Sequence, residues 1–134
     1  MNEQEKSIYL KALMYIAMAD DEVEEDEIQY FQKLGIMYGL KEQQIADLQK
    51  SVINREESIE SILLGLTERS TKLTLLYDLV ALCYADGKYS IVEKTGLQKI
   101  CEIMGVETTK TTELEEVMKE SLELQNRINS ILER

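Results

Sequence analysis

Two segments of this 134-residue chain repeat each other at a constant offset of 66 residues, and this repeat constrains the fold more than any other feature. Residues 10–40 align with residues 76–106 without a gap. The identical pairs include an apolar pair, two acidic pairs and a glycine pair: Leu10 with Leu76, Asp20 with Asp86, Glu27 with Glu93, and Gly39 with Gly105. Any two amphipathic helices in register share apolar positions, so the acidic and glycine pairs are the more informative. The repeat predicts two similar halves related by an approximate twofold axis.

Each repeat has the pattern of a helix, a tight turn and a second helix. In the second copy, Asp86 and Gly87 form a turn dipeptide, because glycine accepts a positive φ angle at no steric cost. Ser90 and Glu93 then match a capping box, in which each side chain bonds the other residue's backbone N–H. Gly105 suits the left-handed position that ends many helices. The pattern therefore predicts a helical hairpin with an acidic turn.

The rest of the chain also favours helix. It has no proline and only six glycines, and Leu, Ile, Glu, Lys and Gln are abundant. We expect seven helices: one ending near Ala19, one from about Ile28 to Gly39, one over Glu42–Ile53, one capped by Asn54 with Glu57, one over Leu73–Tyr84, one over Ser90–Met104, and one starting at Thr112 with Glu115. Period-two alternation between turns, the mark of strands, is absent. The sequence predicts a single all-α domain over residues 1–134, a compact bundle of about seven helices.

Two of these helices have distinctive apolar patterns. The segment Leu73–Tyr84 is apolar nearly all round, with Thr74 and Asp78 as its strongly polar members, so we expect it to be the buried central helix. The last helix has a long apolar stripe that consists of Val117, Met118, Leu122, Ile128, Ile131 and Leu132. This stripe could cover the core or dock on a partner, and the sequence does not separate the two.

The chain is strongly acidic, with 26 Asp and Glu against 15 Lys and Arg and a net charge of −11. Such a field repels nucleic-acid phosphates and anionic lipid headgroups, so we expect no nucleic-acid partner. It attracts cations and basic protein surfaces, although acidity also serves solubility alone. The sequence predicts no signal peptide and no membrane span, since the longest apolar run, residues 79–85, is far too short. Without CxxC spacing or any histidine, Cys83 and Cys101 are expected to be reduced core residues of a cytoplasmic protein.

The duplicated turn resembles that of a known family. An apolar helix that ends in Ala-Asp-Asp or Ala-Asp-Gly, followed by a hydrophobic residue two places on and then a glutamate, occurs at Asp20 and again at Asp86. This pattern is similar to that of the TerB-like tellurite-resistance family, and the resemblance covers about residues 10–106. It implies a bundle of about seven helices with pseudo-twofold symmetry, a cytoplasmic stress-response setting, a membrane-associated protein partner, and a link to metal or oxyanion resistance. The chain departs from the family pattern at Asp21, which replaces the usual glycine.

The resemblance singles out four carboxylates: Asp20 and Glu27 in the first copy, and Asp86 and Glu93 in the second. If the twofold axis brings them together, they could share one divalent cation such as Ca²⁺ or Mg²⁺, which prefer oxygen ligands. An EF-hand is excluded, because Glu25 stands where its glycine is needed and Phe31 where its bidentate glutamate belongs. The alternative is structural, with each acid bonding free N–H groups of its turn and of the following helix.

Catalysis has little support in the sequence. Because the chain has no histidine, it offers neither a Ser-His-Asp nor a Cys-His arrangement, and it has no glycine-rich phosphate loop. A small hydrolase would need a buried carboxylate with a raised pKa, whereas these acids lie in polar turns. We expect the seven tyrosines to pack on helices with their hydroxyls at the surface, or in part to form an interface. The sequence thus predicts a noncatalytic scaffold or adaptor that binds another protein, with a cation-binding module as the alternative.

Overall fold

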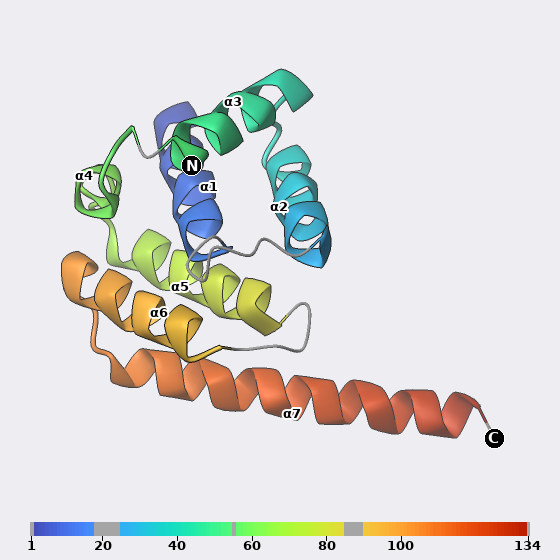
Figure 1. Ribbon diagram of the computed structural model, residues 1–134. Helices are drawn as coiled ribbons and strands as arrows, with labels where there is room; N and C mark the ends of the chain where they lie inside the picture. The colour runs from blue at the N-terminus through green and yellow to red at the C-terminus, as the bar shows by residue number, and fades with distance from the viewer. Residues whose placement is uncertain (1, 18–24, 55, 85–89, 134) are drawn as a thin grey trace.

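The computed structural model describes residues 2–17, 25–54, 56–84 and 90–133, and within these ranges it contains helices and no strand (Figure 1). The helices are α1 (Glu3–Ala17), α2 (Glu25–Met37), α3 (Glu42–Ile53), α4 (Ile59–Leu63), α5 (Arg69–Tyr84), α6 (Ile91–Met104) and α7 (Thr109–Leu132). The predicted all-α fold with about seven helices is confirmed. The predicted bounds of the third helix, Glu42–Ile53, are those of α3.

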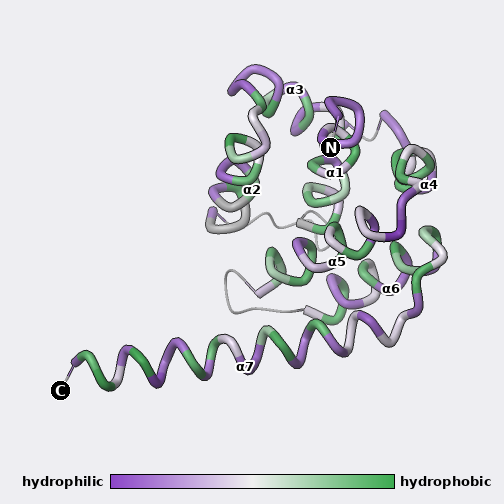
Figure 2. Tube along the Cα trace, turned by 180° about the vertical axis from the view of Figure 1, so that it is seen from behind, coloured by the Kyte–Doolittle hydropathy of each residue, from purple (hydrophilic) through white to green (hydrophobic). Residues whose placement is uncertain are grey.

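Helices α1 and α5 together form the centre of the bundle. The first contacts α2, α3, α4, α5 and α6, and the second contacts α1, α2, α6 and α7. Leu75, Leu76 and Leu79 of α5 are completely buried, which confirms the predicted central helix, although α5 begins four residues earlier, at Arg69. Leu10 and Leu13 of α1 are buried to the same degree. In Figure 2, α1 lies between α2 and α4, and α5 lies between α1 and α6.

The helix ends follow the spacing of the sequence repeat. Helices α5 and α6 begin 66 residues after α1 and α2, and they end 67 residues after them. Gly39 and Gly105 have positive φ angles of 82° and 71°. The residue after each glycine donates its N–H to a carbonyl five residues earlier, so both helices end in the same hydrogen-bonded turn. The helix ends therefore recur at the predicted interval, while the twofold relation between the hairpins remains a prediction.

Two predicted helix starts are wrong. Asn54 is the C-cap of α3, and the N-cap of α4 is Ser58, whose hydroxyl accepts a hydrogen bond from the Ser61 N–H at 3.1 Å. Helix α7 begins at Thr109 and not at Thr112. In both places a residue pattern that favours capping lies three or four residues from the actual start. Glu115, predicted to cap α7, is instead buried within its second turn, with a carboxylate oxygen 3.9 Å from the Lys94 ammonium.

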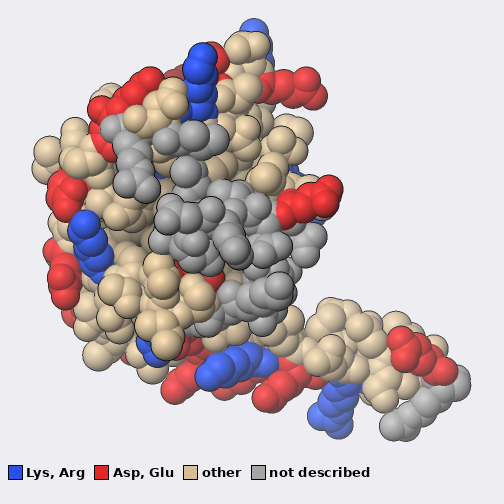
Figure 3. Space-filling model, viewed as in Figure 1, with Lys and Arg blue, Asp and Glu red and all other residues tan. Residues whose placement is uncertain are grey.

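The second half of α7 extends away from the other helices. Its first turns pack on α5, where Thr111 and Glu115 are buried. Residues 119–132, which we call the α7 arm, are all exposed. Figure 3 shows the end of this helix standing clear of the rest of the molecule, with both signs of charge on it. The beginning of the apolar stripe covers the core, where Met118 packs against buried residues, and the rest of the stripe is exposed. Docking of the exposed part on a partner remains a prediction.

Two further sequence predictions concern the thiols and membrane insertion. Cys83 and Cys101 are buried and not joined in a disulfide, as predicted, and burial raises the pKa of the Cys101 thiol. In the part of the chain that the structure describes, no helix combines the length and the apolar character that crossing a bilayer requires.

Candidate functional site

The four carboxylates predicted to hold a cation are placed only in part. Asp20 and Asp86 lie outside the described residues, as does the side chain of Glu27, whose backbone belongs to α2. Glu93 is therefore the member whose surroundings are known. Among the residues that the structure does describe, no group of three or more acidic or cysteine side chains could hold a metal ion. The shared cation site remains a prediction.

Glu93 has a defined structural role at the start of α6. Its side chain accepts a hydrogen bond from the Ser90 N–H at 3.1 Å, and the Ser90 hydroxyl accepts one from the Glu93 N–H at 3.0 Å. This is the capping box predicted from the sequence, and it provides acceptors for backbone donors that a helix start leaves unpaired. Glu93 is 3% exposed, so its carboxylate lies at the edge of the core. For Glu93, these hydrogen bonds support the structural alternative, in which the acid bonds free N–H groups at the start of a helix.

A buried polar cluster, which the sequence did not predict, joins three helices. The hydroxyl of Tyr9 in α1 donates a hydrogen bond to the Asp78 carboxylate in α5, and the hydroxyl of Tyr38, just after α2, donates to the same oxygen at 3.1 Å. The two rings meet edge to face, with their centroids 5.4 Å apart. Burial raises the pKa of Tyr9 far above its ordinary value, and the hydrogen bond to Asp78 raises it further. Tyr9 therefore stays protonated and remains a donor at physiological pH.

This cluster corrects the prediction that the tyrosine hydroxyls lie at the surface. Tyr9 is completely buried, whereas Tyr77 does reach solvent and is 45% exposed. The signal that could have revealed the cluster was Asp78 itself, because a carboxylate in an otherwise apolar helix requires a hydrogen-bonding partner from elsewhere in the chain. The arrangement suits a structural connection between α1, α2 and α5, since Tyr9 and Asp78 are buried and Tyr38 is half-buried.

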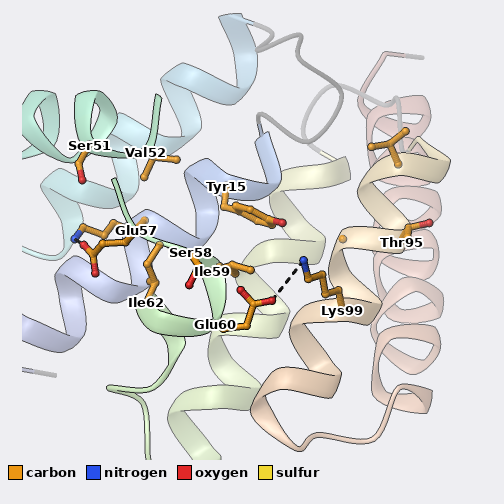
Figure 4. A pocket seen from close by; sticks show the side chains of 13 residues that line it. Tyr15, Ser51, Val52, Glu57, Ser58, Ile59, Glu60, Ile62, Thr95 and Lys99 are labelled. Atoms are coloured by element: carbon orange, nitrogen blue, oxygen red, sulfur yellow. Dashed lines mark hydrogen bonds and ion pairs between the residues drawn. The ribbon is translucent and has the colours of Figure 1, made fainter. Parts of the chain in front are cut away.

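A pocket of about 630 Å³ opens between α1, the end of α3, α4 and α6 (Figure 4). Its walls combine apolar side chains with two ion pairs. The Lys11 ammonium lies 2.5 Å from a Glu57 carboxylate oxygen, and the Lys99 ammonium lies 3.5 Å from one of Glu60. The remaining lining residues are Tyr15, Ser51, Val52, Ser58, Ile59, Ile62, Val92, Thr95 and Gly96. The volume falls within the range of small-molecule sites, about 300–1,000 Å³.

Several polar groups of this pocket already have partners within the protein. A hydrogen bond from its own backbone N–H, together with the nearby Lys99, keeps the pKa of Glu60 below its ordinary value, so its carboxylate is ionised at neutral pH. The Ser58 hydroxyl is already used to cap α4. A serine or threonine nucleophile needs an adjacent base, and the lining residues supply only paired carboxylates and lysines.

The second candidate surface is the apolar face of α7. Six large hydrophobic side chains are exposed along this helix, and each of them is between 41% and 76% accessible: Val117, Leu122, Leu124, Ile128, Ile131 and Leu132. At 100° per residue they fall on one half of the helix circumference, opposite Glu116, Lys119 and Glu123. A contiguous apolar surface of this kind on a soluble protein commonly marks a site of protein–protein contact.

Comparison with known proteins places the chain in a family. Neither the curated proteins nor the solved structures contain a significant match to it. A protein-family model, described as tellurite resistance protein TerB, matches residues 8–116. The matched segment runs from α1 into the first turns of α7 and so includes both hairpins of the repeat and the buried Tyr9 and Asp78. The chain belongs to the TerB tellurite resistance family.

Proposed function

We propose that this protein is a noncatalytic, cytoplasmic adaptor of the TerB family, which acts in tellurite resistance through protein–protein contact made by the apolar face of α7. The observation that carries the proposal is the exposure of six large hydrophobic side chains on one face of a helix whose far half is exposed at every described residue. Burying such a face releases about 25 cal/mol per Å² of apolar surface. The helix is already formed and anchored, so a partner gains this energy without ordering the segment.

Two features of the described residues support a binding role over a catalytic one. The pocket walls hold hydroxyls and ion pairs but no base positioned to activate a nucleophile. In the tyrosine–aspartate cluster, Tyr9 is completely buried and Asp78 is 8% exposed, so these two groups are poorly accessible to a substrate. Most of the charged groups in these two places already have a partner within the protein.

The proposal is tested by complementation under tellurite. A strain that lacks this protein would receive the wild type, the apolar-face variant Leu124→Glu with Ile128→Glu, or the polar-face control Lys119→Gln with Glu123→Gln. All four positions are exposed, so each variant should fold, which circular dichroism would verify. The apolar-face variant should lose tellurite tolerance and the control should keep it. Full tolerance in the apolar-face variant would contradict the proposal.

A further inference from the structure

The apolar face of α7 has the spacing of a helix that pairs with another helix. Positions three and then four residues apart are occupied by Leu114, Val117, Ser121, Leu124, Ile128 and Ile131. These are the a and d positions of successive heptads, which form the seam of a two-helix coiled coil, and only Ser121 among them is polar. From Val117 onward every described a and d side chain is exposed, so this part of the seam is accessible to a partner helix.

We propose that the partner of this seam is a second copy of the same chain, bound antiparallel through the two α7 arms. The inference rests on the proposed function, since it takes the apolar face of α7 to be a protein-binding surface and names what binds there. An antiparallel pair places each a residue against a d residue of the other helix. Val117 then faces Ile128 of the partner subunit, and Ser121 faces Leu124 of the partner subunit. By symmetry each of these contacts occurs twice.

Charge complementarity selects this orientation and this partner. Glu120 and Arg127 occupy the g positions that flank the seam. In the antiparallel register Glu120 faces the partner's Arg127, and the reciprocal pair forms on the same side. A parallel pair would instead place Glu120 opposite Gln125 and Arg127 opposite Leu132, which gives no ion pair. Opposite charges across paired helices decide both partner and orientation.

The distribution of charge along the chain also favours self-association through the arm. The whole protein carries −11, so two copies repel each other over most of their surfaces. The arm is locally neutral, because Lys119 and Arg127 balance Glu120 and Glu123. Antiparallel pairing brings the neutral arms together and keeps the acidic bodies at opposite ends of the paired helices. The 14 residues of the arm span about 21 Å, or nearly four turns.

The arm lies outside the segment that the family model matches. That match ends at residue 116, and the first exposed seam residue is Val117. The proposed contact is therefore argued from this chain's own residues, and it adds to what family membership says.

Sedimentation velocity over a series of protein concentrations tests the dimer. Wild type should shift from monomer to dimer as concentration rises. E120R and R127E should each weaken the dimer by about tenfold, since each turns two attractive surface pairs into repulsive ones. The double variant E120R/R127E should recover wild-type association, because it restores both pairs with their signs exchanged. Wild type that stays monomeric, or a double variant that is as weak as the singles, would overturn the proposal.

Cysteine cross-linking tests the orientation. In the antiparallel register an equal mixture of S121C and L124C should form a disulfide-linked heterodimer faster than either protein alone forms a homodimer. In a parallel pair each position meets itself, so rapid self-linking of each variant would reject the register. K119C, on the polar face, is the matched control and should link slowly in every mixture. The native Cys83 and Cys101 are buried, which limits their interference.

The outcomes separate this inference from the proposed function. If wild type remains monomeric and the L124E/I128E variant still loses tellurite tolerance, the second copy is rejected while the arm remains a protein-binding surface. If wild type forms the antiparallel dimer and L124E/I128E keeps full tolerance, the dimer stands and the role in tellurite resistance is rejected.

Discussion

Asp78 is a carboxylate placed inside the bundle, and two tyrosine hydroxyls stabilise it there. Tyr9 and Tyr38 reach the same oxygen from α1 and from the end of α2. Removing a partner from a buried polar group leaves the cost of its desolvation uncompensated. The cluster therefore connects three helices only while all of its members are present.

Replacement of Tyr9 by phenylalanine tests this account. Tyr9→Phe keeps the ring in the core and removes one donor to Asp78, so the free energy of unfolding should fall by about 1.5–3 kcal/mol. Urea denaturation followed by circular dichroism would measure the change. Tyr77→Phe, at an exposed position, is the control and should have little effect. Equal unfolding midpoints for the two variants would show that the buried hydroxyl contributes nothing.

The same cluster predicts a loss of stability at alkaline pH. Burial raises the pKa of Tyr9 above its ordinary value of 10.0, so the folded state retains a proton that the unfolded state loses. Stability is therefore complete below pH 10 and falls as pH rises above it. Denaturant midpoints measured from pH 8 to pH 11 should decrease above pH 10 in wild type, and less steeply in Tyr9→Phe. A parallel decrease in both proteins would assign the effect to other groups.

The N-caps of α6 and α7, one a serine and the other a threonine, allow a comparison of capping with and without a side-chain hydrogen bond. Ser90 caps α6 with its hydroxyl, whereas the side chain of Thr108, the N-cap of α7, makes no capping hydrogen bond. Ser90→Ala should lower the free energy of unfolding by about 1 kcal/mol, and Thr108→Ala should change it much less. Ser90→Asp should lower the free energy of unfolding much less than Ser90→Ala does, because a carboxylate can cap the same N–H. Thermal denaturation of the three variants checks the order.

A helix end is predicted well from the sequence where a single residue determines it. It is predicted poorly where contacts with distant parts of the chain are involved. Gly105 fixes the end of α6, because a left-handed backbone favours glycine, and the sequence predicts it correctly. Asn54 with Glu57 has the pattern of a capping box, yet Ser58 starts α4, and Glu57 pairs with Lys11 of α1 instead. That contact spans 46 residues, so no local pattern contains it.

The left-handed end of α6 yields a prediction of its own. A Cβ added at Gly105 would meet no atom within 4 Å, so the effect of substitution there is purely conformational. Gly105→Ala should lower the free energy of unfolding by about 1–2 kcal/mol, which is the strain of a left-handed alanine. Gly105→Asn should be less costly, since asparagine tolerates this backbone. Chemical denaturation of both variants measures the difference, and equal losses would argue against a conformational origin.

For the molecule as a whole, the sequence predicts the helical fold and the TerB family but not the surfaces available for binding. The pocket assembles residues from α1, α3, α4 and α6, which are far apart in the chain. The α7 arm is exposed because the other helices do not extend along it. The sequence could not show this, because the helical periodicity of α7 is the same in its packed half and in its exposed half. The buried cluster likewise joins Tyr9 to Asp78 across 69 residues.

The predicted cation site is also a property of the whole molecule, because it requires both halves to meet. If the four acids share one ion, calorimetric titration with Ca²⁺, Mg²⁺, Mn²⁺ and Zn²⁺ should show a single site. Asp20→Asn with Asp86→Asn should abolish that binding, since each change removes a charged oxygen ligand. Glu56→Gln with Glu102→Gln removes the same charge from exposed positions and should leave binding intact. Unchanged affinity in the first double variant would reject the site.

The position of α1 has a consequence for how the protein unfolds. Although this helix belongs to the first repeat, it also contacts α4, α5 and α6, and Tyr9 bonds Asp78 of the second repeat. Neither hairpin can lose its structure without exposing apolar surface of the other. Denaturation is therefore expected to be cooperative, with both hairpins melting in one transition, and a fragment containing only one of them would lack half of its interior.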